Sequence, residues 1–329
     1  MTDNESLPML SVVIPVYNVS KYVIKAVDSV INQTIKPYEV IIVDDGSTDG
    51  SGELVKNHYS DLEFVKIIRT ENQGLGEARN VGTNAATGDY IYYFDSDDLI
   101  ENNLIENFYK ALRLNSDIDI FAFSAESFPD DIVDNNHADS AWLPHYRRGA
   151  ETVYESGEDA FNELSVKEAF YPNAWLYIYK RQLQVKHGLK FKPIIHEDEE
   201  FTPRLFFVAG KIVVTDQVFF LRRVRAGSIM QSARSEKNVI GYLKSIESLE
   251  SLLSANENEV TKRNLRGRII SNILNIILIK RNSQVIFSDT TLSEYNLILS
   301  RNGNFLTKIA SLNFFVYRVL NFGFRKFKA

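Results

Sequence analysis

The sequence contains no cysteine among its 329 residues. Disulfide bonds and thiolate-ligated metal sites are therefore excluded, and such a composition suits a reducing compartment. No stretch approaches about 18 consecutive apolar residues, which argues against a membrane-spanning helix. Residues 1–6 carry two acids and no basic or apolar block, so we expect no secretory signal and a cytoplasmic location.

Basic residues are outnumbered by acidic ones, and they are unevenly placed. The formal net charge of -6 argues against a general nucleic-acid-binding protein. After Glu294 the imbalance reverses, because no acid follows. The bases in this last part are Arg301, Lys308, Arg318, Arg325, Lys326 and Lys328. Residues 305–327 mix these bases with aromatic side chains, which predicts either peripheral contact with an anionic membrane or packing against the catalytic domain or a second subunit.

Short apolar runs alternate with helical patterns over the first hundred residues. The runs that we predict to be strands are Leu10–Ile14, Glu39–Val43, Phe64–Ile68 and Tyr90–Phe94. Strands that are apolar on both faces indicate a mostly parallel sheet covered by helices, and hence an α/β fold. We expect Pro15 to end the first strand, because proline lacks the N–H that a sheet ladder uses.

Polar clusters follow these strands. Right-handed crossovers place the carboxyl ends of parallel strands on one edge of the sheet, where open α/β sheets bind ligands. The side chains expected at this edge are Asp44, Asp45, Asn72, Asp95 and Asp97. A binding site explains this convergence, whereas the alternative is that Asp, Asn and Gly serve only as turn formers.

The densest acidic cluster is Asp95 to Asp98. If the chain stays extended after the fourth strand, Asp95 and Asp97 point to the same side and favour a divalent cation between them. A solvated acidic turn is the alternative. Asp98 followed by Glu101 matches a capping box, so we expect Asp98 to cap the next helix.

The glycine pattern restricts the ligand. Gly74 and Gly76 suggest a dinucleotide fingerprint, but the third position is occupied by Arg79, and the turn after the first strand is not glycine-rich. A nicotinamide site is disfavoured, and a Walker loop is absent. Carboxylates suit the donors of a base and a ribose, and a metal suits a diphosphate, so a nucleoside diphosphate fits both.

Four segments together resemble the inverting family 2 glycosyltransferases of GT-A fold. These segments are Ser11–Asn18, Val43–Asp49, Asn72–Asn80 and Gly88–Asp98. The resemblance implies a Rossmann-like nucleotide-binding sheet with helices on both faces. It also implies a catalytic domain over residues 1–230, with a nucleotide-binding half at about 9–115 and an acceptor-binding half at about 116–230, followed by a helical C-terminal region at 231–329.

The resemblance also implies roles for individual residues. Asp97 would be the direct ligand of Mn²⁺ or Mg²⁺, with Asp95 contacting the ribose or a metal-bound water, and Asp95–Ser96–Asp97 would be the D-x-D motif. Asp45 would accept the imino proton of the base. The residues implied to bind the nucleotide sugar are Pro15, Tyr17, Asp45, Asn72, Arg79, Asp95, Ser96, Arg225 and Ser228.

An inverting transfer needs a base for the acceptor hydroxyl. His196 is followed by four acids, which the helix dipole would favour as an ordinary first turn. By the resemblance, Glu197 and Asp198 match the family's E-D pair, so Asp198 is the expected base and Glu197 the alternative. Trp175 would face the acceptor sugar, although the aromatic stretch around it also suits a core strand.

The loop at 220–229 would place Arg225 and Ser228 over the diphosphate, with Arg222 or Arg223 sharing that role. Some relatives have a histidine metal ligand in this region, and this loop has none. The polar interval 127–157 has no assignable motif, although such loops are commonly acceptor-specific, and its His137 and His145 are expected at the surface.

The sequence thus predicts a metal-dependent inverting transferase. It would move a sugar from a nucleotide-diphosphate donor, in particular a UDP-sugar, to a glycan or lipid-linked glycan in bacterial surface-polysaccharide assembly, at the inner face of the membrane and as a homo-oligomer. One alternative is a nucleotidyltransferase of similar fold, which would need a glycine-rich basic loop after the first strand. The other is a degenerate glycan-binding or scaffold subunit.

Overall fold

The structure is a computed structural model, and it describes the chain except for residues 1–6, 131–142, 150, 226–233, 284 and 313–329. The chain divides into two compact units. The first unit comprises Met1–Pro193 and Phe201–Gln231, and the second comprises Ile194–Glu200 and Ser232–Ala329. Each unit is described by itself below.

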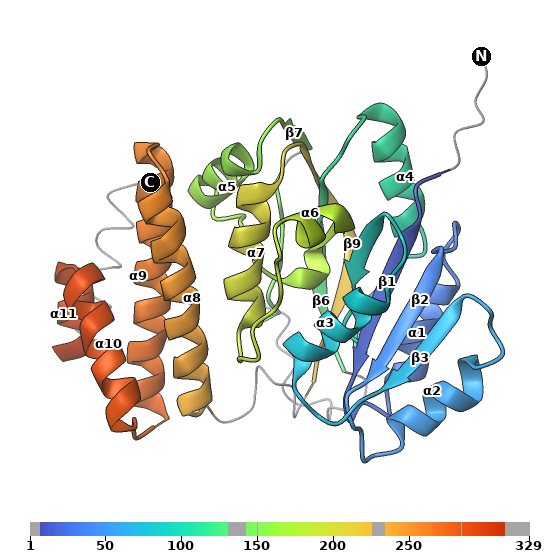
Figure 1. The fold of residues 1–329 in the computed structure, drawn as a ribbon, viewed down its shortest axis with the longest axis horizontal. Helices are drawn as coiled ribbons and strands as arrows, with labels where there is room; N and C mark the ends of the chain where they lie inside the picture. The colour runs from blue at the N-terminus through green and yellow to red at the C-terminus, as the bar shows by residue number, and fades with distance from the viewer. Residues whose placement is uncertain (1–6, 131–142, 150, 226–233, 284, 313–329) are drawn as a thin grey trace. The chain divides into compact units, whose positions relative to one another are not determined.

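The first unit begins with four strands and three helices in strict alternation (Figure 1). They are β1 (Leu10–Val16), α1 (Val23–Ile31), β2 (Glu39–Asp44), α2 (Ser51–Tyr59), β3 (Val65–Arg69), α3 (Leu75–Ala85) and β4 (Tyr90–Tyr93). The strands lie in the order β3-β2-β1-β4 and all pair in parallel. The predicted alternation and the parallel sheet are confirmed.

The prediction that Pro15 ends the first strand is wrong. Strand β1 continues to Val16, and Pro15 is in register with Val43 of β2. On the other side of β1 the pairing with β4 extends only to Val13. Proline is tolerated where a strand has lost one neighbour, because no ladder bond is required on that side.

Helices cover both faces of this sheet. Val12 and Ile14 of β1 belong to the same core cluster as Val27 of α1. Val13 points to the opposite face, where a Cβ on Gly82 of α3 would lie 2.3 Å from its Cγ1. Because strand side chains alternate in direction, α1 and α3 must lie on opposite faces.

The rest of the first unit extends the sheet to nine strands in the order β3-β2-β1-β4-β8-β6-β9-β5, with β7 also paired to β9. The elements are β5 (Leu99–Ile100), α4 (Leu104–Leu114), β6 (Ile120–Pro129), β7 (Thr152–Tyr154), α5 (Gly157–Val166), the 3₁₀ helix η2 (Ala174–Leu176), β8 (Tyr177–Lys180), α6 (Arg181–Lys186), α7 (Glu197–Val208) and β9 (Ile212–Val224). Strand β8 is antiparallel to β4 and β6, so the second half of the sheet is mixed.

The second unit is helical, as the apolar spacing predicts. It contains α8 (Glu236–Ala255), α9 (Glu259–Asn282), α10 (Asp289–Asn302) and α11 (Phe305–Leu312). Leu243 and Ile246 of α8 and Ile269 and Ile273 of α9 are fully or almost fully buried. In the part of the chain that the structure describes, no helix is both long and apolar enough to span a bilayer. The first turn of α7 also belongs to this unit.

Candidate functional site

The Asp95–Asp98 cluster lies on a tight turn after β4. Strand β4 ends at Tyr93, and the N–H of Asp98 donates to the carbonyl of Asp95 at 3.2 Å. The condition that the chain stays extended through Asp97 is therefore not met, because the backbone turns within the cluster. The turn still keeps Asp95 near enough to Asp97 to raise the pKa of the Asp97 carboxyl.

Two arginines from different elements neutralise this pair of carboxylates. Arg79 of α3 places Nη2 2.9 Å from Oδ1 of Asp95. Arg225, directly after β9, places both Nε and Nη2 2.8 Å from Oδ2 of Asp97. The Arg79 guanidinium is buried near the rings of Tyr93 and Phe191, at 5.8 and 5.4 Å from their centroids. Arg79 and Arg225 lie far from each other in the sequence, and the fold brings both to the Asp95–Asp97 pair.

Burial and neighbouring charges shift the pKa values of Asp97 and Asp98. Burial raises the pKa of Asp97, and Asp95 raises it further, whereas Arg225 lowers it. Burial and the two neighbouring carboxylates raise the pKa of Asp98 well above its ordinary value. Like charges in one turn repel one another, so the guanidinium groups of Arg79 and Arg225 stabilise the turn.

Asp98 does not cap a helix, which corrects the capping-box prediction. Helix α4 begins at Leu104 with Asn103 at its N-cap. The Asp98 carboxylate instead accepts a hydrogen bond from the N–H of Arg223 at 2.6 Å. Residues 99–100 pair with β9 as strand β5, so pairing with a distant strand overrides the local capping pattern.

Asp130 and Tyr22 join the site, and sequence reasoning missed both. Arg223 donates from Nε to the carbonyl of Asp97 at 3.0 Å and lies 3.5 Å from Asp130 through Nη1. The hydroxyl of Tyr22 donates to Asp130 at 2.6 Å. The guanidinium carbons of Arg223 and Arg225 lie 5.1 and 5.0 Å from the centre of the Tyr22 ring. The period-two spacing of Arg223 and Arg225 was an available signal, because residues two apart in an extended chain point to the same side.

Asp45 is a buried carboxylate that supports the loop between β3 and α3. Its Oδ1 accepts from the N–H of Gln73 at 2.9 Å and from the hydroxyl of Thr70 at 3.2 Å. Its Oδ2 accepts from the N–H of Gly74 at 2.9 Å. These bonds join the ends of β2 and β3, as the predicted convergence requires. A contact between Asp45 and a nucleotide base stays a prediction.

The other residues expected to bind the donor have mixed exposure. Pro15 and Ser96 are buried, whereas the Tyr17 side chain is 49% exposed and Asn72 is also exposed. Ser228 lies outside the described residues. Arg222 donates to the hydroxyl of Tyr146 at 3.0 Å and acts on Asp98 through its charge, whereas Arg223 hydrogen-bonds to the acidic turn directly.

Comparisons with known proteins show the family of this chain. The family model described as "Glycosyl transferase family 2" matches residues 11–163. Glycosyltransferase GlyG of Streptococcus pneumoniae is 31% identical over 237 residues, which cover 68% of this chain and 73% of GlyG. This chain belongs to glycosyl transferase family 2. Glycosyltransferase GlyA of the same organism is 32% identical over 67% of this chain, but the match spans only 31% of the length of GlyA.

Solved structures show the fold of this family 2 chain. Staphylococcus aureus TarS 1-349 in complex with UDP-GlcNAc superimposes with a TM-score of 0.67 at 19% identity, covering 97% of this chain and 92% of that one. Mannosyltransferase PcManGT from Pyrobaculum calidifontis, solved with GDP-Man and Mn²⁺, gives a TM-score of 0.55 at 16% identity, covering 96% of this chain and 83% of that one. The predicted GT-A fold with its C-terminal helices is confirmed.

The family 2 chain offers carboxylates for a metal, but not a complete ligand set. Among the described residues, no group of three or more His, Cys, Asp or Glu side chains is arranged to hold an ion. Asp95 and Asp97 supply half-buried carboxylate oxygens, with side chains 23% exposed. Magnesium sites of this type commonly use one or two carboxylates together with substrate phosphates. The residues therefore fit the protein's share of such a site.

Trp175 belongs to the core in this structure. Its indole ring stacks on Phe220 with centroids 4.2 Å apart, and the side chain is 5% exposed. The ring of Tyr146 meets it edge-on at 5.0 Å. The ring face toward Phe220 cannot pack on a sugar, so the core interpretation fits better, and an acceptor contact stays a prediction.

The acids after His196 form the first turn of α7. Glu197 is 6% exposed, whereas Asp198 is half-buried and accepts from the N–H of Glu199 at 2.9 Å. The helix-dipole interpretation of this acidic run is therefore correct for its local structure. Exposure favours Asp198 over Glu197 as the side chain that can meet a substrate.

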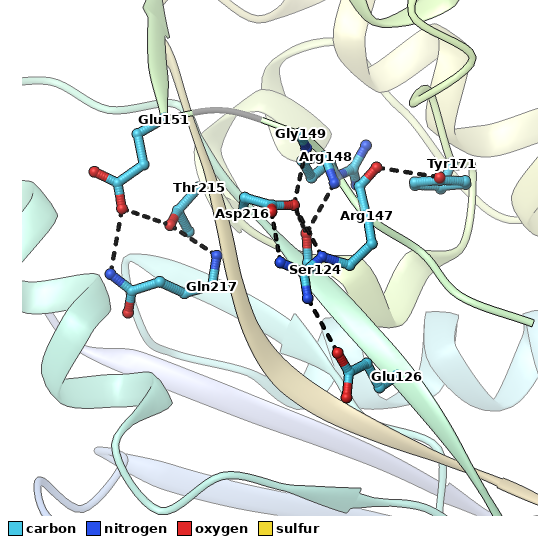
Figure 2. A network of polar contacts seen from close by, with 10 residues as sticks. All are labelled: Ser124, Glu126, Arg147, Arg148, Gly149, Glu151, Tyr171, Thr215, Asp216 and Gln217. Atoms are coloured by element: carbon cyan, nitrogen blue, oxygen red, sulfur yellow. Dashed lines mark hydrogen bonds and ion pairs between the residues drawn. The ribbon is translucent and has the colours of Figure 1, made fainter.

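Residues 147–149, within the interval that the sequence left unassigned, are fixed by a polar network on β6 and β9 (Figure 2). Asp216 accepts from Arg147 Nη2 at 2.6 Å, from the N–H of Gly149 at 2.8 Å and from the hydroxyl of Ser124 at 2.9 Å. Arg147 also pairs with Glu126 at 3.0 Å. His145 is exposed, and His137 lies outside the described residues.

This network predicts acid sensitivity. Hydrogen bonding from Arg147, with help from Gly149 and Ser124, lowers the pKa of Asp216 to about 2 from an ordinary 3.8. Because the folded-state pKa is depressed, the stabilisation is present above about pH 4 and is lost as the pH falls toward about 2. We expect Asp216→Asn to cost roughly 1 kcal/mol at neutral pH, with the difference from wild type shrinking below about pH 4 and vanishing below about pH 2.

Urea unfolding at a series of pH values measures this difference. Asp117→Asn is the matched control, since the Asp117 side chain is 91% exposed. A stability gap between wild type and Asp216→Asn that stayed constant down to about pH 2 would contradict the assignment.

Proposed function

We propose that this protein is an inverting glycosyltransferase that moves a sugar from a nucleoside-diphosphate donor, in particular a UDP-sugar, to a hydroxyl group of a glycan or lipid-linked glycan. The observation that carries the proposal is the acidic turn at the carboxyl end of β4, where Asp95 and Asp97 are paired with Arg79 and Arg225. The fold it shares with TarS, which was solved with UDP-GlcNAc, supports this donor class.

The donor would lie over the carboxyl ends of β1 to β4. The exposed ring of Tyr17 offers a surface for the base, and the Asp45 carboxylate supports the loop that follows. Each carboxylate oxygen has two lone pairs, so Oδ2 of Asp45 retains one for the imino proton after accepting from Gly74. Arg225 can move from Asp97 to the diphosphate, because both partners are anionic and guanidinium binds either.

A divalent cation would be held by Asp97, assisted by Asp95. When bound, such an ion offsets the charge that develops on the departing diphosphate. The chain itself contributes the guanidinium of Arg79, which holds Asp95 in place at 2.9 Å. Arg223 holds the turn from its other side through the carbonyl of Asp97.

Asp198 is the proposed general base. Its carboxylate would take the proton of the acceptor hydroxyl while the acceptor oxygen forms a bond to the anomeric carbon. The bond from that carbon to the diphosphate oxygen breaks in the same displacement, and its electron pair leaves with the nucleoside diphosphate. Attack from the face opposite the leaving group inverts the anomeric centre.

The acceptor side of the proposal includes the C-terminal region. Phe305, Lys308 and Leu312 of α11 are exposed side chains at the end of the described chain. Arg318, Arg325, Lys326 and Lys328, the other bases of the predicted basic aromatic stretch, lie outside the described residues. Exposed apolar side chains beside basic ones suit the surface of an anionic membrane. This contact would bring the enzyme to a lipid-linked acceptor at the inner face of the cell membrane, in polysaccharide synthesis.

A thermal-shift panel tests the donor class. We expect UDP with Mn²⁺ to raise the melting temperature by a few degrees, because a ligand that binds only the folded state stabilises it. GDP, ADP and CDP at the same concentration serve as matched comparisons for the choice of base. A melting temperature that no nucleoside diphosphate changes, with or without metal, would contradict the proposal.

A further inference from the structure

Helix α8 contacts the backbone just before the first turn of α7 more closely than a side chain would permit. A Cβ on Gly241 of α8 would lie 1.8 Å from the carbonyl oxygen of Ile195 and 2.9 Å from its carbonyl carbon. Such a distance is far below any real contact, so this helix crossing requires glycine. The position of the segment that leads into Asp198 is therefore set by α8.

The residue after Ile195 is held in an uncommon conformation. His196 has a φ of 68°, in the left-handed region that residues other than glycine adopt only at a cost of about 1 kcal/mol or more. Its ring stacks on Tyr242 at 4.1 Å with an interplanar angle of 24°, and Nε2 lies 3.4 Å from the side-chain amide of Asn238. Burial, together with Arg234, lowers the pKa of His196 to about 4, so the stacked ring is neutral at pH 7.

The residues after Asp198 are fixed by the same helices. Ser245 of α8 donates to the carbonyl of Glu199 at 2.9 Å, and Arg268 of α9 contacts the Glu199 carboxylate at 2.5 Å. Ser248 donates to the buried carboxylate of Glu200 at 2.5 Å. Asp198 thus lies between residues 195–196, which contact α8, and residues 199–200, which contact α8 and α9.

We propose that helices α8 and α9 are a positioning element for Asp198, with Gly241 and the His196–Tyr242 stack as its positioning residues. This inference rests on the proposed function, because it concerns the base of that reaction. The family match ends at residue 163, well before these helices, and the sequence pattern predicted only a helical extension here. A misplacement of about 1 Å in a catalytic group can cost about 10²-fold in rate, so small shifts of this turn are sufficient to matter.

A pair of glycine substitutions tests the proposal. Gly241→Ala forces the Ile195 backbone away, whereas a Cβ on Gly267 of α9 would meet nothing within 4 Å. We expect Gly241→Ala to lower kcat about tenfold or more, with the donor KM and the affinity for UDP within about twofold of wild type. Gly267→Ala is the matched control, because it introduces the same residue inside a helix without a clash. It should match wild type in kcat, in donor KM and in affinity for UDP.

A second pair covers the case in which Gly241→Ala fails to fold. Tyr242→Phe keeps the ring that stacks on His196 and should retain kcat, whereas Tyr242→Ala should lose it. Normal kcat in folded Gly241→Ala, or in Tyr242→Ala, would overturn the proposal. A parallel loss of kcat and UDP affinity would also overturn it, because that pattern indicates general damage.

Hydrogen exchange separates this proposal from the proposed function. Peptides that cover residues 194–200 should exchange faster in Gly241→Ala, and peptides from β1 and β2 should not change. If Asp198→Asn kept full turnover, the assignment of the base would fail, whatever the exchange result. If Asp198→Asn lost turnover while Gly241→Ala kept both turnover and protection at 194–200, only the positioning role would fail.

Discussion

Asp198→Asn is expected to lower the rate of sugar transfer by about 10²- to 10⁴-fold, the range that a general base contributes. The amide keeps the shape of the carboxylate and its acceptor oxygen, so the bond from the Glu199 N–H can remain. It cannot take a proton from the acceptor hydroxyl at neutral pH. The loss of transfer rate is measured by chromatography of the nucleoside diphosphate released in the presence of acceptor.

Glu197→Gln is the matched variant for this experiment. Glu197 is the neighbouring acid on the same turn and is 6% exposed, so we expect a much smaller effect on kcat. Affinity for UDP should be within about twofold of wild type in both variants, because neither residue is assigned to the donor. Near-normal turnover in Asp198→Asn together with a large loss in Glu197→Gln would transfer the role to Glu197.

Asp97→Asn should remove the metal-dependent part of UDP binding. In wild type we expect Mn²⁺ to strengthen UDP binding by about tenfold or more, and in the variant by less than about twofold, because the amide is a weaker ligand for a hard cation. Binding without metal should not weaken. Arg225 loses its carboxylate partner in the variant and becomes available to the diphosphate.

Calorimetric titration of UDP, with and without Mn²⁺, measures both quantities. Asp216→Asn is the control with the same chemical change, since Asp216 contacts Arg147 and Ser124 and no residue assigned to the donor. Unchanged metal dependence in Asp97→Asn would refute the assigned ligand. Weaker UDP binding in the absence of metal would show that the carboxylate, and not the metal, supports the donor.

Much of the first unit could be predicted from local pattern. Apolar runs with helical patterns between them specified β1 to β4, and the parallel topology was inferred from the apolar character of these runs. Strand β3, at the edge of the sheet, is only partly buried. Pro15 was misjudged because the tolerance of β1 for proline depends on where its partner β4 stops. Where β4 stops pairing is a property of the tertiary structure, and the sequence of β1 alone does not show it.

The acidic turn could likewise be predicted only in part from local sequence. The pattern identified Asp95 and Asp97, but it misassigned Asp98. Residues 99–100 pair with β9 instead of starting a helix, so Asp98 accepts a hydrogen bond from Arg223 and caps no helix. Tyr22 and Asp130 were missed because they contact the turn only through Arg223, which lies more than a hundred residues after the turn in the sequence. The resemblance to a family could not supply them, since the quoted motifs do not contain them.

Turnover of a nucleotide-sugar panel by the wild-type protein, with Asp198→Asn as background, tests the central claim most directly. The assay supplies Mn²⁺ or Mg²⁺ with glycan and lipid-linked acceptors and follows release of the nucleoside diphosphate. We predict that at least one nucleotide sugar, from the UDP series, is turned over about a hundredfold or more above the Asp198→Asn background. Equal rates for wild type and Asp198→Asn with every donor would contradict the account.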